Sequence, residues 1–188
     1  MKRAKVRTSA ELNRTYRRFA HQFLEIPQDP SNLAIIGMQT RGVHIGKRVC
    51  EIIEDEFGQK IDFGVLDVTF YRDDFRTKLK IPEVKVTEIP FDLDERDIIL
   101  VDDVLYTGRT VRSAMDALMA YGRPGSIKFC CMVDRGHREL PVSADYVGLY
   151  LPTHHSEEVR VRVKELDEED AIYLIENQEQ GQKQEQEE

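Results

Sequence analysis

The chain has 188 residues, 40% of them hydrophobic and 33% charged, with a formal net charge of −8. This length suits one domain with a substantial core, and the acidic balance argues against a general nucleic-acid binder or a DNA partner. The three cysteines lack metal-ligand spacing, and no secretory signal or membrane-spanning run is visible. We therefore expect a reduced, cytoplasmic protein without membrane contact, in which Cys130 and Cys131 are buried free thiols.

The charge is unevenly distributed along the chain. Residues 165–188 hold ten acids and one lysine, whereas the first eighteen residues hold seven basic residues and one acid. Residues 177–188 are rich in Gln and Glu and lack apolar side chains, so we expect a disordered acidic tail. The preceding part, residues 1–176, is predicted to form a single domain.

The first predicted helix begins after Thr8. Residues Thr8 to Glu11 fit a capping box, and apolar residues then recur at helical spacing through Leu24. The opposite side of this helix is basic and carries Arg14, Arg17, Arg18 and His21. That side is either a solvated surface or a nucleic-acid contact, and the helix alone does not decide between them.

A buried strand, a polar turn and an amphipathic helix come next. The strand is Leu33–Gly37, and the turn contains Thr40, Arg41 and Gly42. Backbone N–H groups at a helix N-terminus and a guanidinium together suit an anion. Taken alone, this turn does not specify which anion.

The following region changes from apolar to polar. Residues 61–71 are rich in β-formers, whereas residues 77–90 are polar and carry Lys78, Lys80 and Lys85. Residues 71–88 are therefore either a solvent-facing loop or a mobile lid that closes over a reacting centre and excludes water.

Residues 98–110 are the most informative stretch. Ile98–Val101 is typical of a central parallel strand, and Asp102 and Asp103 stand where that strand should end. The small-residue turn Tyr106–Thr110 then leads into a helix whose apolar side is Val111, Ala114, Met115, Leu118 and Met119. A helix N-terminus beside two carboxylates suits a ligand with a phosphate and a ribose, or the waters of a bound Mg2+. The alternative is a capped helix after a buried strand, but that requires neither the acid pair nor the Thr-Gly-Arg-Thr run.

Four further β-runs complete the chain. They are Ser126–Val133, Tyr146–Leu151, Val159–Val163 and Ala171–Ile175. Alternating strands and helices through residue 134 predict an α/β fold with a parallel sheet and right-handed crossovers, with ligands at the carboxyl ends of the strands. The pair His154-His155 lacks partners at ligand spacing and is interpreted as a polar turn. Arg160 and Arg162 are interpreted as the solvated side of a half-exposed strand.

The stretch 98–110 resembles the phosphoribosyl-pyrophosphate (PRPP) motif of type I phosphoribosyltransferases. That motif has four apolar residues, two acids, two apolar residues and a Thr/Gly-rich loop, and all thirteen positions here match. The resemblance implies a type I phosphoribosyltransferase fold: a central, mostly parallel sheet flanked by helices, with a small β hood over the active site. It also implies that residues 71–88 form the lid of a phosphoribosyltransferase-like domain.

The same resemblance implies roles for individual residues. Asp102 and Asp103 would hold the ribose hydroxyls and orient waters of a Mg2+ ion that is held mainly through PRPP. Further roles are implied for the diphosphate turn (Thr40, Arg41, Gly42), the 5-phosphate loop (Tyr106, Thr107, Gly108, Arg109, Thr110), the lid (Arg72, Asp73) and the base side (Val133, Asp134, Arg135, with Val159 as a cover).

Tyr106 favours a pyrimidine as the accepted base. Purine-using relatives carry an aspartate at this position, whereas the more acidic N1 proton of uracil has less need of a general base. Together with Tyr71–Asp74 and Asp134–Pro141, the motifs over residues 8–177 resemble the pyrimidine operon attenuation regulators, which are also uracil phosphoribosyltransferases. The implied partners are PRPP, uracil, UMP or UTP, the pyrimidine-gene leader mRNA, and other copies of the chain in a homo-oligomer.

The resemblance also implies a basic RNA-binding face. The residues assigned to it are Arg17, Arg18, His21, His137 and Arg138, with Arg135 nearby. Arg17 replaces a threonine that RNA-binding members tend to have, and Ser143 and Leu149 replace two of their cations, which weakens phosphate contacts. A uracil salvage enzyme without RNA regulation, and a purine phosphoribosyltransferase, therefore remain alternatives.

Overall fold

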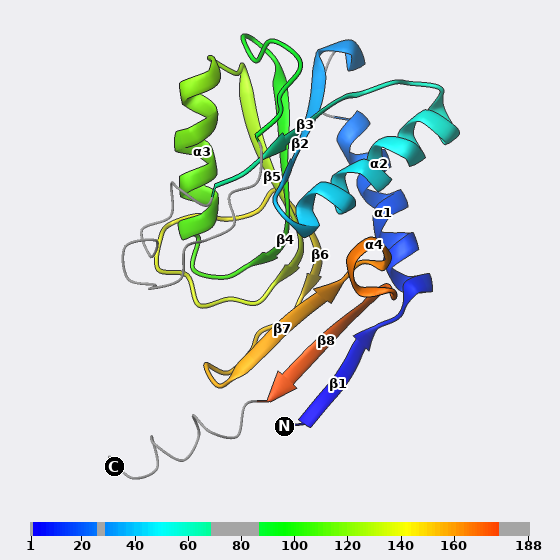
Figure 1. Ribbon diagram of the computed structural model, residues 1–188, viewed down its shortest axis with the longest axis vertical. Coiled ribbons are helices and arrows are strands. Elements are labelled where there is room, and N and C mark those ends of the chain that lie inside the picture. Colours follow the sequence, from blue (N-terminus) through cyan, green and yellow to red (C-terminus); the bar gives the residue numbers. More distant parts are fainter. Residues whose placement is uncertain (1, 26–28, 69–86, 177–188) are drawn as a thin grey trace.

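The main sheet has five strands in the order β3-β2-β4-β5-β6, and every neighbouring pair is parallel. This computed structural model describes residues 2–25, 29–68 and 87–176 (Figure 1). The strands are β2 (Leu33–Met38), β3 (Asp62–Leu66), β4 (Asp97–Leu105), β5 (Ser126–Asp134) and β6 (Tyr146–Tyr150). The predicted parallel α/β sheet is confirmed.

Helices cover both faces of this sheet. The helices are α1 (Ser9–Leu24), α2 (Arg41–Phe57) and α3 (Arg109–Tyr121), and a short 3-10 helix, η1 (Pro30–Asn32), precedes β2. Figure 1 shows α3 on one side of the sheet and α1 with α2 on the other. Alternate side chains of β4 therefore enter two separate cores: Ile99 and Val101 pack with α1 and α2, whereas Ile98 and Leu100 pack with α3. This explains the unbroken apolar run in the sequence.

A second, three-stranded antiparallel sheet forms the hood. Its strands, in the order β1-β8-β7, are β1 (Lys2–Arg7), β8 (Ala171–Glu176) and β7 (Glu157–Arg162). The short helix α4 (Lys164–Asp167) connects β7 to β8. Val159, Val161 and Val163 are buried, as their alternation predicted. Strand β1 was not predicted, because its six residues are mostly basic and it exists by pairing with β8, which lies about 170 residues away in the sequence.

Two expectations about the central stretch are wrong. Strand β4 does not end before Asp102 but continues to Leu105, because β5 pairs with it as far as Leu105 and Asp134. Met119 was expected on the buried side of α3 but is 60% exposed, and Ala117 is buried instead. The capping box of α1 is confirmed: the Glu11 carboxylate accepts the Thr8 backbone N–H at 2.9 Å.

Candidate functional site

The β4–α3 turn provides a helix N-terminus at the carboxyl edge of the main sheet. Gly108 is the residue before α3 and has φ of 90°, a left-handed conformation that favours glycine. The carbonyl oxygen of Thr107 accepts N–H groups of Glu139 at 3.0 Å and Leu140 at 3.1 Å, so the segment after β5 fixes the turn. The first N–H groups of α3 lack partners within the helix, which makes this turn suitable for a phosphate.

The two carboxylates before this turn differ in their access. Asp102 is 8% exposed and accepts the backbone N–H of Asp103 at 2.8 Å. Asp103 accepts the N–H of Val104 at 2.8 Å and lines a cavity of about 510 Å3. Burial raises the pKa of the Asp103 carboxyl above its usual value, and the guanidinium of Arg41 opposes that rise. Asp103 is therefore the acid of the pair that faces this cavity.

The β2–α2 turn lies directly against β4. A Cβ atom on Gly42 would overlap the carbonyl oxygen of Val101 and lie 3.1 Å from the Cα of Asp102. Only a glycine permits this approach of α2 to β4. The contact brings Arg41, the first residue of α2, to the acid pair, and Arg41 and Asp103 line the same cavity.

Arg41 connects the core to the hood. Its Nε and Nη2 atoms donate to the two carboxylate oxygens of Asp167 in α4, at 3.1 and 2.9 Å. This fork-shaped pair raises the pKa of Arg41 and lowers that of Asp167. The cavity is lined from both sides by Arg41, Asp103, Val104, Glu158, Val159, Arg160, Val161, Arg162 and Asp167. The site is thus a cleft between the main sheet and strand β7, with three arginines around it.

Sequence reasoning missed four charged residues of this cleft, Glu158, Arg160, Arg162 and Asp167. Asp167 had no recognisable signal, since it is one of several acids in residues 165–170. Arg160 and Arg162 were interpreted as solvated residues, yet both line the cleft. Their alternation with valines placed them on one side of a strand, and that pattern could not reveal what the side faces.

Most of the residues expected on the base side lie at the end of β5 and just after it. The Arg135 guanidinium lies 4.2 Å from the ring centroid of Tyr106, and the His137 ring meets the same ring edge-on at 5.9 Å. Arg135 is buried and donates to the hydroxyl of Thr153 at 3.1 Å and the carbonyl of Glu157 at 2.7 Å. Arg135 therefore holds the loops before β7 against the tyrosine.

Arg138 is directed into the protein. It donates to the carbonyl oxygens of Tyr106 at 2.7 Å, Val142 at 3.0 Å and Gly136 at 3.1 Å, and pairs with the Asp134 carboxylate. Of the other assigned base-side residues, Val133 is fully buried in β5 and Val159 lines the cleft. Arg138 therefore joins the β4–α3 turn to the segment after β5.

The three candidate RNA-binding residues of α1 lie outside the cleft. Arg17 forms an ion pair with Glu56 of α2 at 3.3 Å, and His21 meets Phe57 edge-on. Arg18 donates to the carbonyl oxygens of residues 147 and 148 in β6, at 3.0 and 3.1 Å. Arg72 and Asp73 of the expected lid, and the expected acidic tail, lie outside the described residues.

Comparison with known proteins gives the family. The model of the phosphoribosyl transferase domain matches residues 9–166. The Bifunctional protein PyrR of Elusimicrobium minutum is 49% identical over 170 residues, which cover 90% of this chain and 95% of that protein. The chain belongs to the PyrR family of phosphoribosyltransferases. The PyrR protein of Bacillus subtilis is 46% identical over 169 residues, covering 89% of this chain and 93% of its own.

Solved structures agree on the fold. The hypoxanthine phosphoribosyltransferase of Staphylococcus aureus has a TM-score of 0.69 at 17% identity and covers 94% of this chain and 93% of its own. That of Trypanosoma cruzi, in complex with IMP, also has a TM-score of 0.69, at 16% identity, and covers 93% of this chain and 94% of its own. At these identities the likeness shows the type I phosphoribosyltransferase fold alone. Among the described residues, no helix is both long enough and apolar enough to cross a bilayer.

Proposed function

We propose that this PyrR-family chain is a uracil phosphoribosyltransferase that converts uracil and PRPP to UMP and diphosphate. We further propose that it binds pyrimidine-gene leader mRNA in response to UMP and so attenuates transcription. The observation that carries the enzymatic proposal is the convergence of Asp103 and Arg41 on one cleft, with the N-terminus of α3 following the strand that carries Asp103. These groups supply a ribose-binding acid, a diphosphate-binding cation and a phosphate-binding turn.

The reaction replaces diphosphate at the anomeric carbon with N1 of uracil. Its transition state has oxocarbenium character, so positioning and charge stabilisation do most of the work and no protein nucleophile is required. Backbone N–H groups of residues 106–110 would hold the 5-phosphate, and Asp102 with Asp103 would hold the ribose hydroxyls. Arg41 would accept the departing diphosphate, together with Thr40 and Gly42. Arg72 and Asp73 of the lid would close over it.

Magnesium would be held chiefly by PRPP rather than by a protein cage. Among the described residues, no three or more His, Cys, Asp or Glu side chains gather where they could bind a metal. The cleft instead presents Asp103 next to Arg41, which suits an ion that arrives with the diphosphate and needs its waters oriented. When bound, the ion would neutralise charge on the departing diphosphate.

Uracil is the base that the site suits best. Tyr106 stands where purine-using enzymes have an acid, and the Asp134 carboxylate is engaged by Arg138. No described side chain of residues 133–135 is therefore a free general base, and the N1 proton of uracil has the least need of one. Backbone groups of residues 133–135 would recognise the base edge, with Val159 covering it.

The RNA-binding proposal relies on α1. Arg17 has a 66% exposed side chain, and Arg14, Arg18 and His21 share the outer side of this helix. Arg138 would act indirectly, because its contacts join the segment carrying His137 to the nucleotide site. That connection offers a route by which bound UMP affects RNA affinity. We also propose that the chain acts in the cytoplasm as a homo-oligomer.

The enzymatic proposal is tested by incubating the protein with PRPP, labelled uracil and Mg2+. UMP formation supports it, and its absence under conditions where a known uracil phosphoribosyltransferase is active refutes it. Turnover of hypoxanthine or guanine in place of uracil would favour the purine alternative.

The RNA proposal is tested by filter binding of the leader transcript at stated salt, with and without UMP. A UMP-dependent gain in affinity supports it. Affinity that ignores UMP, or that is lost at moderate salt, leaves the salvage enzyme as the function.

A further inference from the structure

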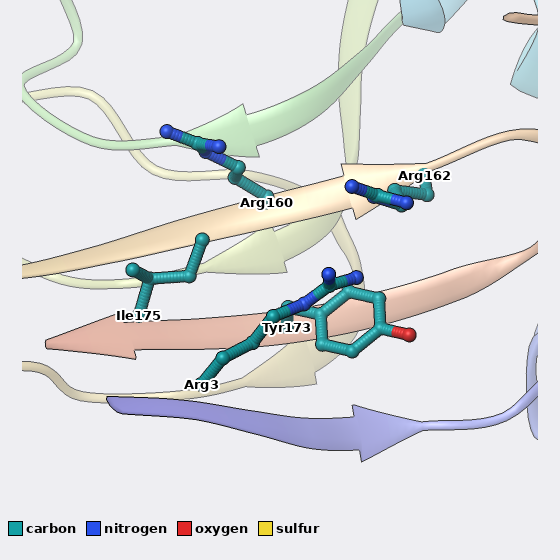
Figure 2. A pocket seen from close by; sticks show the side chains of 5 residues that line it. All are labelled: Arg3, Arg160, Arg162, Tyr173 and Ile175. Atoms are coloured by element: carbon teal, nitrogen blue, oxygen red, sulfur yellow. The ribbon is translucent and has the colours of Figure 1, made fainter. Parts of the chain in front are cut away.

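One face of the hood sheet carries a cluster of four basic side chains, Arg3, Lys5, Arg160 and Arg162, above an apolar layer, here called the floor, that is formed by Tyr173 and Ile175. In the strand register, Lys5 and Arg160 flank Tyr173, while Arg3 and Glu158 flank Ile175, and directly paired residues share a face. Tyr173 and Ile175 are 7% and 3% exposed and belong to a small apolar cluster of their own. Figure 2 shows the arginines rising above this floor on the same side of the sheet.

These cations are not neutralised by their protein partners. Arg3, Lys5 and Arg162 all approach the carboxylate of Glu169, at 3.4, 3.2 and 2.9 Å, and the Tyr173 hydroxyl donates to it as well. Arg160 pairs with Glu158 at 2.7 Å. Four cations thus contact two carboxylates, which leaves an excess of two positive charges (four minus two). Each guanidinium has five N–H donors, so most donors here remain open to a ligand.

The cluster encloses a cavity. Its volume is about 280 Å3, and Arg3, Arg160, Arg162, Tyr173 and Ile175 line it (Figure 2). The Arg3 guanidinium lies 3.5 Å from the Tyr173 ring centroid, and that of Arg162 lies 5.5 Å from it. Stacking on one buried ring restricts both guanidinium groups, so they lose less freedom when an anion binds.

We propose that this cavity, the hood anion pocket, binds a di- or triphosphate group. Planar guanidinium groups form forked hydrogen bonds with phosphate oxygens, and three of them meet in this pocket. Pockets that enclose whole drug-sized ligands span about 300–1,000 Å3, so the volume here suits a phosphate chain rather than a complete nucleotide. This phosphate chain belongs either to inorganic polyphosphate or to a nucleotide whose base stays outside the pocket.

The hood anion pocket adjoins the catalytic cleft. Arg160 and Arg162 line both cavities, whereas Arg3 lines only the hood pocket and Arg41 only the cleft. An anion in the hood pocket draws on two cations that also face the cleft. Occupancy of the pocket therefore weakens PRPP binding without excluding it, which gives partial rather than complete inhibition.

The test is calorimetric titration of the full chain with inorganic triphosphate at low salt. We expect Arg3→Gln to weaken the hood site roughly tenfold, since it removes a charge-assisted hydrogen-bond donor. Lys128→Gln is the matched control: both side chains are 42% exposed and each has one ion pair, at 3.2 Å for Lys128 and 3.4 Å for Arg3. Lys128→Gln should bind like the wild type, and equal affinities of the two variants overturn the proposal.

A second variant changes affinity in the opposite direction. Glu169→Gln removes the carboxylate that occupies three of the cations, so triphosphate should bind about three- to tenfold tighter. A substitution that merely disturbs the fold would not increase the affinity for triphosphate. Tighter binding by Glu169→Gln therefore supports the pocket even if Arg3→Gln is unstable. Unchanged or weaker binding by Glu169→Gln refutes the pocket.

Two further titrations assign the site and the source of the phosphate chain. Arg41→Gln should bind triphosphate with wild-type affinity, because Arg41 does not line the hood anion pocket. If this variant instead loses triphosphate affinity, the triphosphate binds in the cleft and the proposal is overturned. A nucleoside triphosphate that binds as tightly as inorganic triphosphate, and equally loses affinity in Arg3→Gln, shows that the pocket recognises the phosphate chain alone. Tighter binding of the nucleotide identifies it as the source.

Discussion

Substituting Gly42 with alanine should impair catalysis by separating the two halves of the cleft. The added Cβ would overlap the Val101 carbonyl oxygen and approach the Asp102 Cα to 3.1 Å, and both are backbone atoms that cannot rotate away. Relieving the overlap requires α2 to retreat from β4 by about 1 Å. Arg41 begins this helix and Asp103 belongs to β4, so the groups proposed to bind diphosphate and ribose move apart by that amount.

The size of the effect follows from this displacement. A misplacement of about 1 Å costs roughly 10²-fold in catalytic efficiency, and overpacking of this kind costs about 1–3 kcal/mol of unfolding free energy. For a chain of this length, that loss lowers the melting temperature by roughly 2–12 °C. Steady-state kinetics with varied PRPP, together with thermal unfolding, measure both quantities.

Gly58→Ala provides the control for Gly42→Ala. Gly58 ends α2 with φ of 67°, and nothing lies within 4 Å of a Cβ placed there. Alanine is strained at this φ and should cost about 1 kcal/mol in stability, yet it leaves the cleft in place and kcat/KM for PRPP unchanged. The reasoning fails if Gly42→Ala retains wild-type kcat/KM, or if both variants lose activity equally.

Three further predictions concern charged groups. Asp103→Asn should lower kcat/KM for PRPP by about 10²–10³-fold. Because burial raises the Asp103 pKa, kcat/KM of the wild type should begin to fall, as the pH is lowered, at a higher pH than an ordinary carboxyl would give. The pH profile of the variant should lack that step. Asp167→Asn should cost at most about 1 kcal/mol, since the Arg41 side chain is 35% exposed. Because Arg41 lowers the Asp167 pKa, denaturant unfolding should show this cost above pH 3.8, and the difference should vanish as pH falls through the lowered pKa. Arg138→Ala should cost about 1–3 kcal/mol by removing the donor to the part-buried carbonyl oxygen of Val142 and the more exposed one of Tyr106. A melting temperature equal to the wild type would contradict a structural role of Arg138 between these segments.

The phosphoribosyltransferase family was recognisable from local sequence motifs. The run 98–110 specifies a strand, an acid pair and a turn into a helix within thirteen consecutive residues. Thr8 and Glu11, three residues apart, form the capping box of α1. The burial of Val159 and Val161 follows from the two-residue repeat of a strand. Such features depend on neighbours in the chain, so the sequence displays them directly.

Only the tertiary structure decided which charged groups meet. Arg41 and Asp167 are 126 residues apart in the sequence, and they pair because α4 of the hood lies beside the β2–α2 turn. Likewise, β1 becomes a strand only through β8, and it carries Arg3 to Tyr173. Long charged side chains at the surface have many possible partners, and neither periodicity nor spacing specifies which one the fold supplies. The sequence by itself therefore determined the strand, the acid pair and the turn before α3, whereas the packing of the hood on the main sheet decided that Arg160, Arg162 and Asp167 join Arg41 around the cleft.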